Sequence, residues 1–152
     1  NYAIKKVKSK FMCVLDSDDE YNSNALKNII FILRKIKSNT DMVFGNYEFY
    51  TLKKDKKNIN IKPVAVSHTY KRIKYTTVKK MSLYHLITIH STIFSTKILK
   101  KINPLPEHVS YADNLLVYSS LLQSKNIAYI NKNVYLYKYF IRPGQQSISI
   151  EK

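Results

Sequence analysis

The chain has 152 residues, of which 45% are hydrophobic and 24% charged. These values are ordinary for one soluble globular domain and exclude global disorder. The longest purely apolar runs, residues 11–15 and 29–33, fall far short of the roughly 20 residues of a membrane-spanning helix. The first ten residues carry no apolar h-region, so we expect no signal peptide, and the single cysteine, Cys13, favours a reducing, cytoplasmic setting.

The unusual property of the chain is its charge, because it has 26 basic and 10 acidic residues, which give a net charge of +16. Such a field attracts polyanions, either nucleic acid or an anionic membrane surface. A second explanation is compositional, since the chain is rich in Lys, Ile, Asn and Tyr, as AT-rich codons produce whatever a protein does. Only three of the basic residues are Arg, the side chain that reads bases and phosphates in bidentate fashion, so we expect no specific nucleic-acid partner.

The first elements form a strand–helix–strand series. Residues 11–15 (FMCVL) form a continuous apolar run, which predicts a strand buried on both faces of a mostly parallel sheet. A helix begins at Asn22 or Ser23 as N-cap, buries Leu26, Ile29, Ile30, Leu33 and Ile36, and ends near residues 38–40. Residues 41–50 read as a second strand.

The second half returns to order after a basic stretch. Residues 53–80 hold ten Lys or Arg against one acid, which indicates either an arm for phosphates and lipid headgroups or a solvated loop. A strand is expected within 83–94, a short helix over 96–101 and a Pro-containing loop up to residue 111. A helix from Asp113 to about Ser124 and strands over 127–131 and 134–140 complete an α/β pattern.

A cluster of carboxylates directly follows the first strand. Asp16, Asp18 and Asp19 lie within four residues, and their mutual repulsion is costly unless a cation or hydrogen-bond donors offset it. Ligands bind outside the carboxyl ends of strands in open α/β sheets, so the place favours a Mg²⁺ or Mn²⁺ site. The alternative is an acidic entry to the following helix.

These motifs occur in an order that resembles a known family. Residues 1–26, with the Leu15-Asp16-Ser17-Asp18-Asp19 stretch at their centre, resemble the middle of a family 2 glycosyltransferase of the GT-A fold. Further segments are similar to a bacterial subgroup that makes cell-surface glycans, namely residues 89–91, 96–99, 105–115, 137–141 and 146–147. The fold implied is α/β, a partial GT-A domain (nucleotide-diphospho-sugar transferase) with a mixed sheet flanked by helices.

The resemblance implies a role for each matching residue. Asp16 and Asp18 match the Asp-x-Asp motif that contacts the nucleotide sugar and the divalent ion, with Asp18 as the direct metal ligand. Asp113 matches the general base that acts on the acceptor hydroxyl. The remaining matches are Arg142 and Ser147 beside the donor pyrophosphate, and His90 and Tyr111 on the acceptor side.

The reaction implied is inverting transfer by a hexosyltransferase-type enzyme, from a nucleotide diphosphate sugar to a hydroxyl. The expected donor is a UDP-sugar, the acceptor a glycan or a lipid-linked glycan, and the cofactor Mn²⁺ or Mg²⁺. The expected location is the cytoplasm, at the inner face of the plasma membrane, where Lys-rich surfaces contact anionic lipid.

Family members start with nucleotide-binding strands that have no counterpart in residues 1–152. The resemblance therefore implies the C-terminal two-thirds of one GT-A domain, inactive alone and prone to form a homodimer or to aggregate through an uncovered sheet edge. Two alternatives stay open. One is a basic module that binds nucleic acid or an anionic surface without catalysis, and the other is a non-catalytic remnant that binds a partner.

Overall fold

The structure is a computed structural model that describes residues 1–52, 59–64, 73–81, 87–107, 109, 112–130 and 135–141. A five-stranded mixed sheet has the order β1 (Phe11–Met12), β7 (Thr92–Ser95), β3 (Met42–Phe44), β8 (Asn126–Tyr129) and β6 (Lys74–Thr77). A four-stranded sheet has the order β2 (Glu20–Tyr21), β9 (Tyr135–Ile141), β4 (Asn46–Leu52) and β5 (Ile59–Val64). The helices are α1 (Tyr2–Lys6), α2 (Ser23–Lys35), α3 (Thr96–Leu99) and α4 (Ala112–Gln123), with 3-10 turns η1 (Val78–Lys80) and η2 (Ile89–Ser91).

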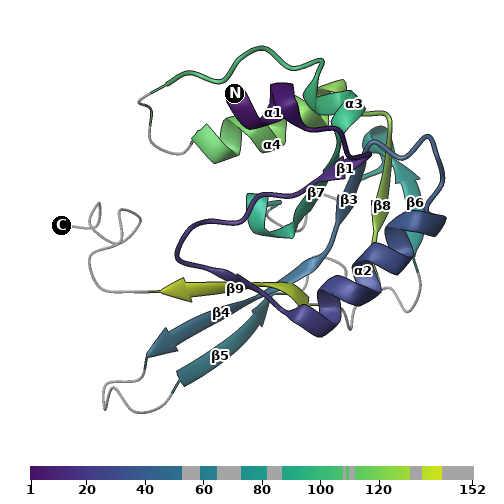
Figure 1. The fold of residues 1–152 in the computed structure, drawn as a ribbon. Helices are drawn as coiled ribbons and strands as arrows, with labels where there is room; N and C mark the ends of the chain where they lie inside the picture. Colours follow the sequence, from purple (N-terminus) through teal and green to yellow (C-terminus); the bar gives the residue numbers. More distant parts are fainter. Residues whose placement is uncertain are drawn as a thin grey trace.

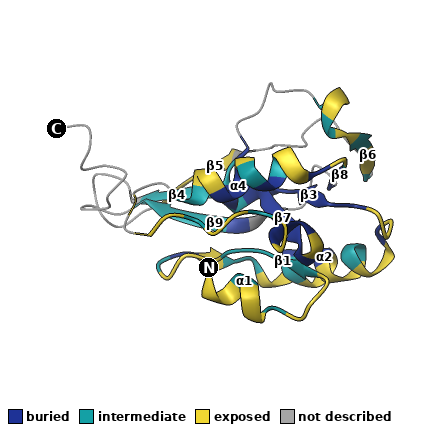
Figure 2. Ribbon diagram, turned by 90° about the horizontal axis from the view of Figure 1, so that it is seen from above, coloured by how far each residue is buried: buried dark blue, intermediate teal, exposed yellow. Residues whose placement is uncertain are grey.

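Helices cover both faces of the five-stranded sheet, which confirms the expected α/β class with a mixed sheet between helices. Successive side chains of a strand point to opposite faces. Val43 of β3 accordingly packs with Ile29 of α2, whereas Met42 and Phe44 pack in a second cluster with Val117 of α4. Figure 2 shows α2 and α4 on opposite sides of the buried β3, and Figure 1 shows β4, β5 and β9 extending away from this layer.

The N-terminus of α2 lies where the sequence predicts it. The Asn22 side chain is the N-cap and accepts hydrogen bonds from the backbone N–H groups of Asn24 and Ala25. The helix ends at Lys35, before the predicted stop. Ile29 is buried as expected, but the burial expected for Ile30 is wrong, because Ile30 lies on the solvent side of the helix with 44% of its surface exposed.

The strand predicted over residues 11–15 is shorter and lies elsewhere in the sheet. Only Phe11 and Met12 pair, antiparallel to β7, and they form the edge of the sheet. Residues 11–14 are half-buried and Leu15 is exposed. The expectation of a fully buried strand in a mostly parallel sheet is therefore wrong. The observed partner is β7, which runs antiparallel to β1, and the only parallel pair among the described strands of this sheet is β3 with β8.

The single strand predicted over residues 41–50 is two strands in different sheets. β3 ends at Phe44 and β4 begins at Asn46, so Gly45 separates them. The Gly45 N–H donates to the Ser91 carbonyl (2.7 Å), outside both strand ladders. A Cβ at Gly45 would lie 3.7 Å from the Ile130 side chain, which is an ordinary contact. The break between β3 and β4 therefore follows from the pairing of the strands and not from steric crowding at Gly45.

Two other predictions need correction. Part of the basic segment 53–80 is regular, since β5 pairs with β4 and β6 pairs with β8, while its exposed lysines include Lys74, Lys79 and Lys80. The strand expected within 83–94 is confined to β7 in the described part, because Ser91 turns the preceding chain. Its hydroxyl donates to the Thr88 carbonyl and accepts from the Thr88 N–H.

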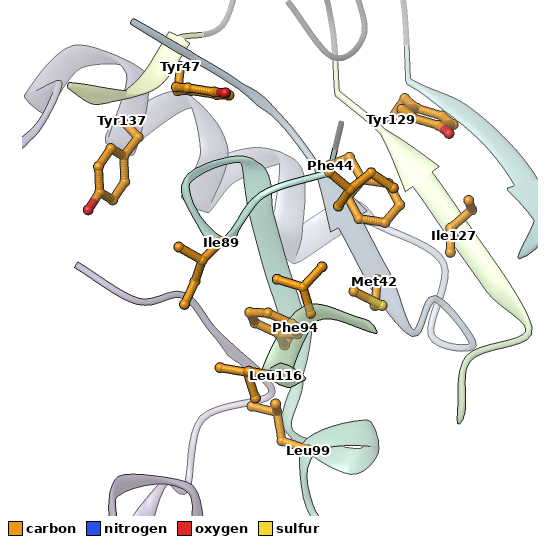
Figure 3. Close-up of a cluster of buried hydrophobic side chains, with 12 residues drawn as sticks. Met42, Phe44, Tyr47, Ile89, Phe94, Leu99, Leu116, Ile127, Tyr129 and Tyr137 are labelled. Carbon is orange, nitrogen blue, oxygen red and sulfur yellow. The ribbon is translucent and has the colours of Figure 1, made fainter. Parts of the chain in front are cut away.

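The remaining predictions agree with the structure to within a few residues. The short helix and the long one become α3 and α4, and the last two strands become β8 and β9. None of the helices in the described ranges is long and apolar enough to cross a membrane. One of the two core clusters includes residues of both sheets, and Figure 3 shows its larger members around Phe94 and Phe44.

Candidate functional site

The carboxylate cluster forms a tight turn between β1 and β2. The Asp19 N–H donates to the Asp16 carbonyl (3.2 Å), which closes a β-turn over residues 16–19 with aspartate in its favoured first position. The three carboxylates differ in exposure. Asp16 is exposed, Asp18 is half-buried, and Asp19 retains only 8% of its surface. The turn therefore offers Asp16 to solvent and directs Asp19 inward.

Asp19 attaches this turn to β9. Its Oδ1 accepts the Phe140 N–H (2.8 Å), and its Oδ2 accepts the Tyr137 hydroxyl (2.8 Å). The same hydroxyl accepts a hydrogen bond from the Asp16 N–H (3.1 Å). A buried carboxylate is tolerated when its oxygens are hydrogen-bonded. The fold itself thus uses both oxygens of Asp19.

His90 faces the turn from η2. Its ring packs against three tyrosines, with centroids 4.7 Å from Tyr137, 4.7 Å from Tyr139 and 5.6 Å from Tyr47. The His90 Nε2 lies 3.9 Å from the Asp16 Oδ2. Burial lowers the pKa of His90 below its ordinary value, although the nearby carboxylates oppose this shift. A neutral imidazole, which has one nitrogen free to accept a proton or bind a cation, is therefore favoured near neutral pH.

Asp113 approaches the same site from α4, which contacts η2. The negative charge of Asp113 contributes to raising the pKa of both Asp16 and His90, so its carboxylate lies within electrostatic range of both. Asp113 is in the first turn of α4 and follows Ala112, which is already helical. Asp113 is therefore a helical residue of α4 and not its N-cap. Of the residues that the sequence singled out, Asp16 and His90 lie 3.9 Å apart, and the charge of Asp113 acts on both of them from α4.

The electrostatics of the turn suit a cation. Burial raises the pKa of Asp16, the charges of Asp19, Asp18 and Asp113 raise it further, and His90 acts in the opposite direction. One ligand atom each from Asp16, Asp19 and His90 lies within 4.8 Å of the others. Two carboxylates and an imidazole fit a divalent cation, and the nitrogen favours Mn²⁺ over Mg²⁺. Asp18 is not part of this group, and its role as direct ligand stays a prediction.

Other predicted site residues cannot be placed. Tyr111, Arg142 and Ser147 lie outside the described residues. Tyr137 lies in the segment 137–141 that resembles the bacterial subgroup, but the resemblance gave this residue no individual role. Asp19 was visible as the third carboxylate outside the Asp-x-Asp match, but nothing in the sequence indicated that it would be buried.

The geometry defines an α/β protein with a carboxylate turn and a neighbouring histidine and aspartate. A family model, glycosyl transferase family 2, matches residues 1–102, which include α1, the turn, α2, η2 and α3. The chain belongs to this family. A comparison with curated proteins gave no significant match. The match supports the GT-A fold and a glycosyltransferase activity at the level of the family, and it does not favour a basic binding module without catalysis.

Proposed function

We propose that this chain carries the metal-motif and acceptor side of an inverting, hexosyltransferase-type enzyme of cell-surface glycan synthesis. The donor is a nucleotide diphosphate sugar, in the first place a UDP-sugar, and the acceptor is a hydroxyl of a glycan or lipid-linked glycan. The observation that carries the proposal is the meeting of Asp16 and Asp19 of the turn with His90 of η2, whose ligand atoms lie within 4.8 Å of one another, while the charge of Asp113 on α4 acts on both Asp16 and His90. Family membership gives the reaction class.

In this proposal Asp113 is the general base. Its carboxylate takes the proton of the acceptor hydroxyl as the oxygen attacks the anomeric carbon, and the bond from that carbon to the diphosphate breaks. Asp16 and Asp18 would hold the cation and the nucleotide, and His90, 3.9 Å from the Asp16 carboxylate, would face the cation and line the acceptor side. When bound, a Mn²⁺ or Mg²⁺ ion offsets the charge that develops on the departing diphosphate.

The proposed location is the cytoplasmic face of the plasma membrane, where lipid-linked acceptors are available. The net charge of +16 supports it, because each Lys or Arg close to anionic lipid contributes ~1 kcal/mol of attraction. Charge alone does not distinguish lipid from other polyanions. Co-sedimentation with vesicles of anionic and of neutral lipid separates this proposal from a purely compositional origin of the charge.

Ligand-dependent melting of the natural polypeptide that contains this chain tests the site. A ligand at 100 times its Kd stabilises the folded state by about 2.7 kcal/mol, so UDP with Mn²⁺ is expected to raise Tm by roughly 5–10 °C. Asp16→Asn and Asp18→Asn should each abolish this shift, without lowering the Tm of the free protein, because carboxylate repulsion is relieved. Glu20→Gln is the matched control, since Glu20 is exposed and pairs with Lys138. A full shift in both aspartate variants would reject the cation site.

A further inference from the structure

The proposed reaction assigns no role to the Tyr137 hydroxyl, although this hydroxyl contacts the carboxylate turn. It donates to the Asp19 Oδ2 (2.8 Å) and accepts from the Asp16 N–H (3.1 Å), so it connects the last carboxylate of the turn to the backbone of the first. Tyr137 and Asp19 are separated by 118 positions in the chain. The contact is thus made by the tertiary fold.

Tyr137 is more deeply buried than any residue of the turn itself. Only 1% of its surface is exposed, and β9 pairs on one side with β2, at Tyr21, and on the other with β4, at Tyr47. Its ring stands edge-on to Tyr21, with centroids 5.6 Å apart. Figure 3 shows the ring at the border of the core, with the hydroxyl directed away from the other labelled side chains. The core therefore presents this one oxygen to the turn.

The same ring also supports His90. The two rings meet at 68° with centroids 4.7 Å apart, and the His90 Nε2 lies 3.9 Å from the Asp16 carboxylate. Tyr137 thus contacts the backbone of Asp16 through its hydroxyl and the imidazole that faces Asp16 through its ring. Both sides of the Asp16–His90 pair are positioned by one buried side chain.

We infer that Tyr137, together with Asp19, is a positioning residue that holds Asp16 and His90 at the spacing that the cation and the nucleotide diphosphate require. The inference rests on the proposed function and extends it to residues that need not touch the ligand. Tyrosine suits the task because one hydroxyl donates and accepts at once, at the end of a rigid ring. The Asp19 Oδ2 accepts the hydrogen bond of this hydroxyl, and the Asp19 Oδ1 accepts that of the Phe140 N–H.

The alternative is that Asp19 binds the cation directly, with Tyr137 only filling the core. Tyr137→Phe separates these roles, because it keeps the ring and removes only the hydroxyl. Outer-shell partners of metal ligands are typically worth 10–100-fold in metal affinity. A positioning role therefore predicts that Tyr137→Phe weakens Mn²⁺ binding roughly 10–100-fold in the presence of UDP. A core-filling role predicts an affinity within about twofold of wild type, because the ring and its packing are kept.

The experiment measures the Kd of Mn²⁺ by electron paramagnetic resonance, with UDP present, on the natural polypeptide that contains this chain. Tyr50→Phe is the matched control, because the Tyr50 hydroxyl also donates to a carboxylate, the Glu48 Oε2 (2.9 Å), away from the turn. The positioning role predicts a weakened Kd for Tyr137→Phe and an unchanged one for Tyr50→Phe. It also predicts that Asp19→Asn added to Tyr137→Phe costs little more than the larger single change, because both act through one contact.

A second measurement distinguishes the two roles even if Tyr137→Phe folds poorly. ¹⁷O-water broadening counts the waters bound to Mn²⁺ in Asp19→Asn, which keeps the tyrosine. Loss of a direct ligand adds a bound water, whereas loss of a positioning contact leaves the count unchanged. An added water, or a normal Kd in folded Tyr137→Phe, overturns the inference and leaves the proposed function standing. Failure of the wild type to bind Mn²⁺ with UDP refutes the proposed cation site, and the inference falls with it.

Discussion

Replacing Asp113 by Asn tests whether its carboxylate has a catalytic role or only a structural one. Asp113 lies in the first turn of α4, where an acidic side chain stabilises a helix by about 0.3–1 kcal/mol through the helix dipole. Removing its charge also relieves repulsion with Asp16, whose pKa it raises. The two effects oppose each other, so we expect the stability to change by less than ~1 kcal/mol, which is about 2–4 °C in Tm for a domain of this size.

The expected effect on the rate is much larger. An amide has no basic lone pair to accept the proton of the acceptor, and general-base catalysis contributes roughly 10²–10⁴-fold. At 1.36 kcal/mol for each tenfold in rate, the barrier should rise by about 2.7–5.4 kcal/mol. The predicted loss of transition-state stabilisation is thus several times the predicted change in folding stability.

The assay is transfer from a UDP-sugar under single-turnover conditions, with the natural polypeptide that contains this chain. We expect Asp113→Asn to slow transfer at least ~100-fold and to leave the affinity for UDP and Mn²⁺ within a few-fold of wild type. Glu107→Gln is the control, since Glu107 is an exposed acid in the loop before α4. Near-normal turnover of Asp113→Asn would refute the reasoning, and a slow Glu107→Gln would move the base to Glu107.

Three further outcomes test the fold. Asn22→Ala removes the cap of α2 and should cost about 1 kcal/mol, read as a lower urea midpoint with an unchanged slope; an unaltered midpoint would contradict the cap. Asp41→Ala leaves the backbone N–H groups of Lys125 and Asn126, at the start of β8, without their acceptor and should cost about 2–5 kcal/mol, whereas Asp41→Asn, which keeps one oxygen, should cost less. Burial raises the pKa of Tyr21 and Tyr47 above the ordinary value of 10, so the stability they contribute is complete below pH 10 and is lost as the pH rises further. Absorbance at about 295 nm should therefore show that part of the tyrosine titration is delayed until the protein unfolds, and ionisation of all tyrosines at ordinary pKa in the folded protein would contradict this burial.

Local signals in the sequence determined the helices and the place of the turn. The Asn22 cap and the apolar spacing after it are sufficient for α2, because a cap and a 3.6-residue period act within a few turns of one segment. The boundaries of α4 follow from the same kind of pattern to within a residue. The carboxylates of Asp16, Asp18 and Asp19 stand after the first strand, where their order alone indicated a cation site.

Only the tertiary structure decided which strands pair and which side chains meet. The run FMCVL has the composition of a central strand, but β7 pairs with its first two residues and leaves it at an edge, because a strand's place depends on partners far along the chain. The division at Gly45 depends likewise on pairing with β9 and β8. The sequence sets Asp18 apart only through its resemblance to the Asp-x-Asp motif, whereas the fold gives Asp19 the Tyr137 hydroxyl and the Phe140 N–H. Contacts across more than a hundred residues leave no periodic pattern in a sequence, so this difference exists only after the sheets have formed.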